Sequence, residues 1–76
     1  MFIEFDLSPP TMLGGVMLEY LQDLIHKWST EHQIPYTQKR VKYTHRLAFN
    51  QDDHYTVFAM TWKDSKIEWR IVDRQW

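Results

Sequence analysis

The residues with acid–base chemistry gather at one place only, in the run Asp52, Asp53 and His54. A carboxylate next to an imidazole is suited to general acid and base catalysis. Catalysis also needs a pocket that excludes water, and a polar run predicted to form a turn in so short a chain leaves little room for one. The serines have other expected roles: Ser8 caps a helix, Ser29 lies on the polar flank of that helix, and Ser65 lies in a turn. We therefore expect no catalytic residues and no enzyme activity.

Four histidines raise the question of a metal site: His26, His32, His45 and His54. No two of them stand four residues apart on a helix, no HExxH pattern occurs, and the chain has no cysteine that would complete a zinc site. His45 alternates with apolar residues, which predicts a buried, hydrogen-bonded histidine. We expect no metal and no cofactor.

Cationic side chains are concentrated in the middle of the sequence. Residues 36–50 carry four cations and no acid, whereas residues 1–35 carry five acids and one lysine. Alternation along the predicted strands places most of these cations, and those of residues 66–74, on one sheet face with a tyrosine. That face would offer cations for phosphates and a ring for stacking on a base. The predicted binding residues are Arg40, Lys42, Arg46, Tyr55, Lys66, Arg70 and Arg74. A solvated face, or a face that binds protein, is the alternative interpretation.

Only residues 9–31 have the spacing of a helix, with Leu13, Met17, Leu21, Leu24 and Trp28 on one side. Ser8 is suited to cap this helix, and Pro9 to occupy its first turn. Gly14, Leu18 and Ile25 flank the apolar stripe and make it wider than one sheet face usually covers. Either strand ends and loops cover these three residues, or they form the interface of a homodimer.

The remaining segments alternate between apolar and polar residues, which predicts strands at 1–7, 37–50, 54–62 and 66–74. The third of these is apolar on both sides and is expected to be central. The fold class is then α+β: a two-layer sandwich of order β-α-β-β-β, with one long helix packed on one face of a mainly antiparallel four-stranded sheet. The position of the first strand stays open.

Length and composition predict a single domain, 1–76, that compensates for its small size with aromatic bulk. The chain has 76 residues, 16% of them aromatic, and a formal net charge of −1. No apolar run reaches the ~20 residues that span a bilayer, and no signal peptide pattern is present. We expect a cytoplasmic protein without a membrane partner.

The function expected from these patterns is that of a small non-enzymatic accessory protein that acts by protein–protein interaction, as an adaptor or inhibitor. Its partner is an unknown protein or a second copy of the chain. The alternative is a nucleic-acid-binding module that uses the basic sheet face around residues 38–46 and 66–74. Trp76 is either folded back on the domain or an anchor for a partner.

Overall fold

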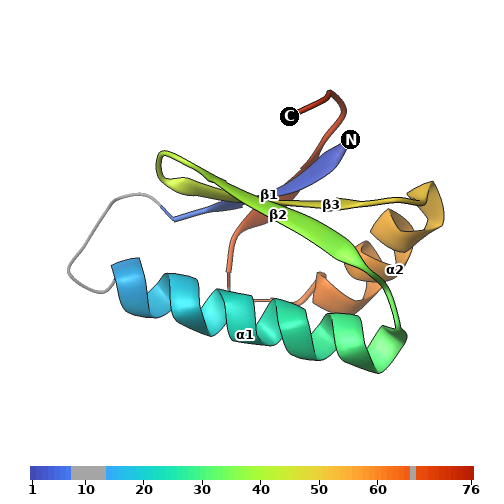
Figure 1. Cartoon of the computed structure of the whole chain (residues 1–76), viewed down its shortest axis with the longest axis horizontal. Helices are drawn as coiled ribbons and strands as arrows, with labels where there is room; N and C mark the ends of the chain where they lie inside the picture. Colours follow the sequence, from blue (N-terminus) through green and yellow to red (C-terminus); the bar gives the residue numbers. More distant parts are fainter. Residues whose placement is uncertain (8–13, 66) are drawn as a thin grey trace.

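The structure is a computed structural model that describes residues 1–7, 14–65 and 67–76. Its elements follow the order β1 (Phe2–Asp6), α1 (Gly14–His32), β2 (Tyr36–Val41), β3 (Thr44–Phe49), α2 (Asp52–Trp62) and β4 (Trp69–Val72). The four strands form one sheet in the order β2-β3-β1-β4, and every neighbouring pair is antiparallel. Both helices cover the same face of this sheet, so its other face is open (Figure 1).

The α+β class and the four-stranded antiparallel sheet agree with the prediction, but the order β-α-β-β-β is wrong. A second helix, α2, occupies the whole of the segment 54–62 that was predicted as a central strand. Tyr55, Phe58 and Trp62 are its buried residues, and their spacing of three and four is that of one helix face. In a strand, Met60 would lie on the same side as Phe58 and Trp62, but in the helix it is 70% exposed.

The segment predicted as one strand, 37–50, is a hairpin of β2 and β3. Lys42 and Tyr43 form its two-residue turn, and Lys42 adopts a positive φ of 54°. Non-glycine residues seldom adopt this left-handed conformation, which explains why no turn was predicted here. The prediction took 37–50 as one continuous strand. Because the chain reverses at this turn, the β2 side chains on the same face as Arg46 are not the ones that simple alternation along one strand predicts.

The central strand is β1, which pairs with β3 on one side and β4 on the other. Ile3 and Phe5 point toward the helices, while Phe2 and Glu4 lie on the open face, and all four are buried. The resulting β-α-β-β-α-β order with this strand order is the ferredoxin-like, or split β-α-β, arrangement. Many unrelated functions share that arrangement, so the topology alone assigns none.

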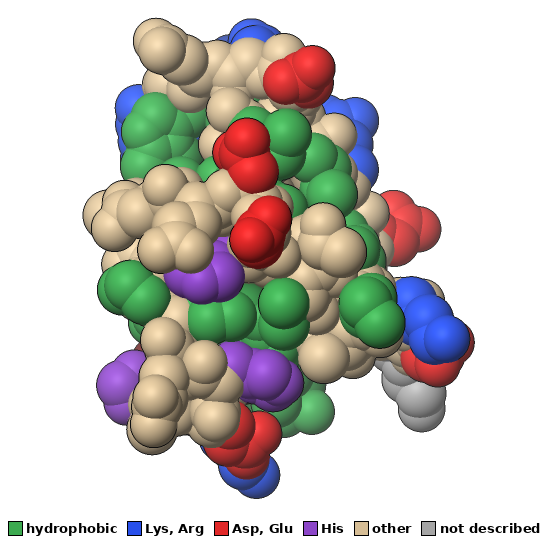
Figure 2. Space-filling view, turned by 90° about the vertical axis from the view of Figure 1, so that its right-hand side faces the viewer, with side chains coloured by type: hydrophobic (Ala, Val, Ile, Leu, Met, Phe, Trp, Pro, Cys, Tyr) green, Lys and Arg blue, Asp and Glu red, His purple; other side chains and the backbone are tan. Residues whose placement is uncertain are grey.

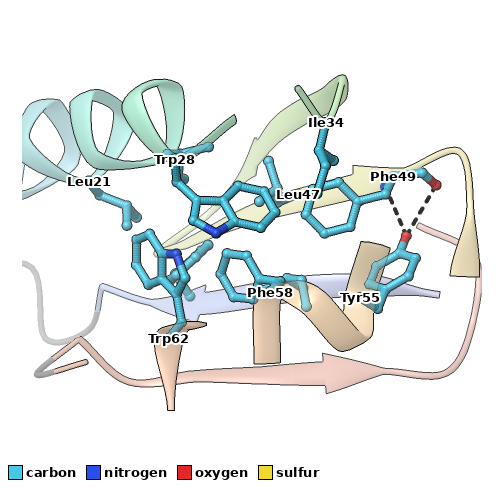
Figure 3. Close-up of a cluster of buried hydrophobic side chains, with 11 residues drawn as sticks. Leu21, Trp28, Ile34, Leu47, Phe49, Tyr55, Phe58 and Trp62 are labelled. Atoms are coloured by element: carbon cyan, nitrogen blue, oxygen red, sulfur yellow. Dashed lines mark hydrogen bonds between the residues drawn. The ribbon is translucent and has the colours of Figure 1, made fainter. Parts of the chain in front are cut away.

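The core lies between the helices and the sheet and is largely aromatic (Figure 3). Phe58 is at its centre: its ring stacks on Trp62 at 4.9 Å and meets Trp28 and Trp69 edge-on at 5.2 and 5.1 Å. Trp28 Nε1 donates a hydrogen bond of 2.8 Å to Thr61 Oγ1 and so joins α1 to α2. Many of the aromatic residues that are frequent in the sequence lie in this core.

Tyr55 connects α2 to the strand ends with its hydroxyl group. The hydroxyl accepts a hydrogen bond of 3.0 Å from the Phe49 amide and donates one of 2.8 Å to the Met1 carbonyl, and it lies 3.5 Å from the Phe49 carbonyl (Figure 3). Buried polar groups that are fully satisfied in this way fix the relative positions of elements. Tyr55 therefore belongs to the core.

The C-terminus of α1 ends in a Schellman motif. Gln33 has a φ of 55°, the Ile34 amide donates to the Ser29 carbonyl at 3.0 Å, and the Gln33 amide donates to the Thr30 carbonyl. This pattern satisfies the last carbonyls of the helix. It places the end of the helix within two residues of the prediction, whereas the predicted cap at Ser8 and the start at Pro9 lie outside the described residues.

Candidate functional site

The open face of the sheet is built around the carboxylate of Glu4, which is only 4% exposed. Cross-strand register places Arg46 of β3 and Arg70 of β4 directly beside it. Arg46 Nε donates to Oε2 at 3.1 Å, and Arg70 donates to Oε1 from Nε at 3.1 Å and also from a terminal nitrogen. Burial alone would raise the pKa of Glu4, but the hydrogen bonds and charges of Arg70 and Arg46 outweigh it and hold that pKa below its usual value.

A second group on this face surrounds the ring of Phe2. The guanidinium groups of Arg46 and Arg74 lie over the ring at 4.7 and 5.8 Å from its centroid. Trp76 packs against the same ring at a centroid distance of 6.3 Å, and Lys39 Nζ lies 5.9 Å from the indole. Phe2 is completely buried as a result, while Trp76 stays 38% exposed. Trp76 is therefore folded back onto the domain.

The predicted basic face is present only in part. Arg46, Arg70 and Arg74 are on it, but Arg40 pairs with the buried His45 on the helix side of the sheet. Tyr55 is in the core and not on this face, because its segment is a helix. Lys42 is in the hairpin turn, and Lys66 lies outside the described residues.

Lys39, Phe2 and Trp76 also lie on the open face, and none of the three was among the binding residues predicted for it. Lys39 was missed because the hairpin turn reverses the faces of β2 relative to β3. Phe2 alternates with Ile3 and Phe5, a signal that does place it on the face opposite the helices.

The free edge of β4 borders an apolar groove against α2. Exposed side chains line it: Met60 is 70% exposed, Met1 43% and Ile71 42%. Asp52 and Lys63 lie at the two ends of the α2 part of the groove. Figure 2 looks onto the adjoining end of the molecule, where hydrophobic side chains also reach the surface between acidic residues and histidines. The lining of this groove is therefore largely apolar between its charged ends.

The other edge strand, β2, has a different character. Four of its six residues, including Gln38, Lys39 and Arg40, are exposed and polar. Charged side chains on an edge strand oppose pairing with another strand.

The residues predicted for a homodimer interface do not form a common exposed surface: Ile25 is fully buried in the core, Leu18 is half-buried, and Gly14 is the first residue of α1. Ile25 thus presents no surface to a second copy.

A cleft between the two helices is lined by Lys27, Trp28, Glu31, Thr61 and Asp64, among others. The indole nitrogen of Trp28 at this cleft already donates to Thr61. The charged residues are exposed at the rim. The described residues that line this cleft therefore offer no buried, unpaired side-chain group that would orient a substrate.

The predicted acid–base cluster is the first turn of α2. Asp52 and Asp53 are exposed there, a position where carboxylates interact favourably with the helix dipole. His54 is half-buried against Phe49, at a ring distance of 6.2 Å. Among residues 1–7, 14–65 and 67–76, no three or more histidine and acidic side chains come together as a metal site would require.

His45 occupies the buried position that alternation predicts, at 2% exposure. Its Nε2 lies 3.0 Å from Gln38 Oε1, so this nitrogen carries the proton and donates to the amide oxygen. Nδ1 is buried without a hydrogen-bond partner. Burial, and next the charge of Arg40, lower the pKa of His45. The surroundings of His45 therefore favour its neutral form.

In the described part of the chain, no helix is long and apolar enough to cross a bilayer. Comparison with family models, with curated proteins and with solved structures found no match for this sequence or fold.

Proposed function

We propose that this protein is a small, non-enzymatic accessory protein that acts through protein–protein contacts, and that β4 and the adjoining α2 groove form its contact surface. The observation that carries this proposal is an edge strand, Trp69–Val72, in which three of the four residues are apolar, beside a groove with three exposed apolar side chains. A strand edge offers unpaired backbone groups, and a neighbouring apolar groove offers area to bury.

The backbone of β4 is oriented for such pairing. The Asp6 amide donates to the Glu68 carbonyl at 3.3 Å, which identifies Asp6 and Glu68 as a hydrogen-bonded pair of the antiparallel ladder. Alternation along the strand then turns the backbone groups of Arg70 toward β1 and those of Trp69 and Ile71 outward. The outward amides lie on the same edge as the groove.

The occupant we propose is a second copy of the chain. Two β4 strands that pair antiparallel about a two-fold axis bring the two Met60–Ile71 grooves together and extend the sheet to eight strands. The same axis brings the Asp52 end of one groove to the Lys63 end of the other, so the charges at the rim are complementary. The polar β2 edge offers no equivalent contact.

The test is the solution mass of matched variants. Met60→Lys adds a charge to the groove at a side chain that is 70% exposed, so the fold should be retained. Tyr20→Lys, at a side chain of α1 that is 56% exposed, is the control. We expect light scattering at high micromolar concentration to give twice the chain mass of 9.4 kDa for the wild type and for Tyr20→Lys, and the single-chain mass for Met60→Lys.

Two results would contradict this proposal. A wild-type mass of 9.4 kDa at every concentration would show that the chain does not self-associate. A dimer that both variants retain equally would place the contact on another surface.

A further inference from the structure

We propose that the open sheet face carries a second binding site, for single-stranded nucleic acid, at the end where Trp76 packs on Phe2. This site goes beyond the proposed function, because it uses the face of the sheet opposite the helices and none of the groove residues. The exposed indole of Trp76 is the platform for a base, and Lys39 and Arg74 are the cations for the adjoining phosphates.

Electrostatics favours a polyanion at this end of the face. Four cations gather around the two rings and Glu4: Lys39, Arg46, Arg70 and Arg74. The carboxylate of Glu4 is already paired with Arg46 and Arg70. The exposed ammonium group of Lys39 donates one hydrogen bond of 3.3 Å, to the main-chain oxygen of Trp76. The side chain of Arg70 is still 73% exposed, so it can contact a phosphate without leaving Glu4.

Acidic side chains lie toward the opposite end of the same face. Asp6 and Glu68 line a small pocket beside Arg70, near the last residues of β1. Phe2 and Trp76 mark the first residues of β1. This polarity places the favourable potential over the aromatic end of the face, although the net charge of the whole chain is −1.

The aromatic geometry explains the preference for single strands. Phe2 is fully buried and supports the indole of Trp76 from below, while Trp76 keeps an exposed surface of 38%. Stacking on an exposed ring requires a base that is not already stacked in a duplex. A cation beside the ring, here Lys39, is suited to the phosphate that follows the stacked base.

The experiment is a fluorescence anisotropy titration of a labelled, mixed-sequence oligonucleotide of twelve nucleotides, single-stranded and as a duplex, at 50 and 200 mM salt. We expect Trp76→Ala to weaken single-strand binding by about tenfold, since stacking of one base contributes about 1–3 kcal/mol and a factor of ten is about 1.4 kcal/mol. Lys39→Gln should weaken binding and lower the slope of log affinity against log salt by about 0.7.

Arg40→Gln is the matched control for Lys39→Gln. It removes the same charge from the next residue of β2, but Arg40 belongs to the helix side of the sheet, opposite His45. Binding should change by less than about twofold at 200 mM salt, where a charge on the far side of the sheet is largely screened. The Met60→Lys variant should bind as the wild type does, because its substitution lies in the α2 groove and leaves the open face intact.

Three outcomes would overturn the inference. The first is no binding by the wild type at 50 mM salt, and the second is equal or tighter binding of the duplex. The third is an equal loss in Lys39→Gln and Arg40→Gln, which would indicate unspecific attraction. Circular dichroism of each variant checks its fold, and Lys39→Gln alters an exposed side chain outside the core, so it decides the question even if Trp76→Ala unfolds.

Discussion

Replacing Glu4 by Gln should destabilise the fold by about 2–3 kcal/mol, and the structure shows how this figure arises. The hydrogen bond from Arg46 is largely buried, with side-chain exposures of 14% and 5%, and a bond of this charged type contributes about 1.5–3 kcal/mol. Arg70 is 73% exposed, so its pair with Glu4 adds less than about 1 kcal/mol. Gln keeps the shape of the side chain but removes the charge that both arginines share.

Urea denaturation followed by circular dichroism measures this change in the free energy of unfolding. The matched control is Glu68→Gln, which removes a carboxylate from an exposed position next to β4 and should change the stability by less than about 0.5 kcal/mol. For a chain of this length the loss in Glu4→Gln corresponds to a fall in Tm of about 10–20 °C.

The pH dependence gives a second readout of the same carboxylate. The pKa of Glu4 is lowered in the folded protein, so its contribution is complete above the ordinary carboxylate range and is lost as the pH falls through the folded pKa. Glu4→Gln should lack this acid-dependent part. A variant as stable as Glu68→Gln, with an unchanged pH profile, would refute the argument that Glu4 organises the open face.

Three further predictions concern the helix side of the sheet. Tyr55→Phe should lower the free energy of unfolding in urea by about 1–3 kcal/mol, because the buried Phe49 amide loses its acceptor. Phe58→Ala should cost about 3–5 kcal/mol and leave the chain largely unfolded by circular dichroism at 25 °C, since this ring is the centre of the core. The lowered pKa of His45 means that the unfolded chain binds a proton before the folded chain does. Stability should therefore be complete above about pH 6.5, the unperturbed histidine pKa, and should be lost as the pH falls from there toward the folded pKa. A His45→Gln variant that keeps the same urea stability profile between pH 6.5 and 5 would contradict this assignment.

Part of the fold was predictable because some segments have one dominant periodicity. The first strand alternates clearly, and the spacing of Leu21, Leu24 and Trp28 predicts a helix that the structure confirms as α1. The end of α1 was also recoverable, since Pro35 disfavours helical geometry in the residue before it.

The second helix was not predictable by the same reasoning. Residues 54–62 are rich in aromatic and β-branched side chains, which favour strands, and alternation there fits as well as helical spacing. Packing decides the outcome: as a helix, the segment buries Tyr55, Phe58 and Trp62 together. Asp52 and Asp53 before this segment are a helix start signal that was assigned to a turn.

The errors in the predicted binding residues have two causes: α2 was taken as a strand, and the hairpin turn at Lys42 was not predicted. Arg46, Arg70 and Arg74 were placed on the open face from alternation alone, whereas Tyr55 was assigned to it by treating α2 as a strand. Because the chain turns at Lys42, Lys39 lies on the open face beside Arg46, and Arg40, which was predicted there, lies on the helix side of the sheet. The position of Trp76 over Phe2 joins residues that are far apart in sequence, and no local pattern predicts such a contact.

The most direct test of the proposed function is amide hydrogen exchange at β4, followed by NMR in dilute and concentrated samples of the wild-type protein. The Ile71 amide points outward from the sheet edge, so it should exchange rapidly in the monomer and become protected as the solution mass doubles. The Arg70 amide faces β1 and should be protected at both concentrations. A mass that doubles while Ile71 continues to exchange rapidly would show that the chains associate without pairing their β4 strands, and it would contradict the account.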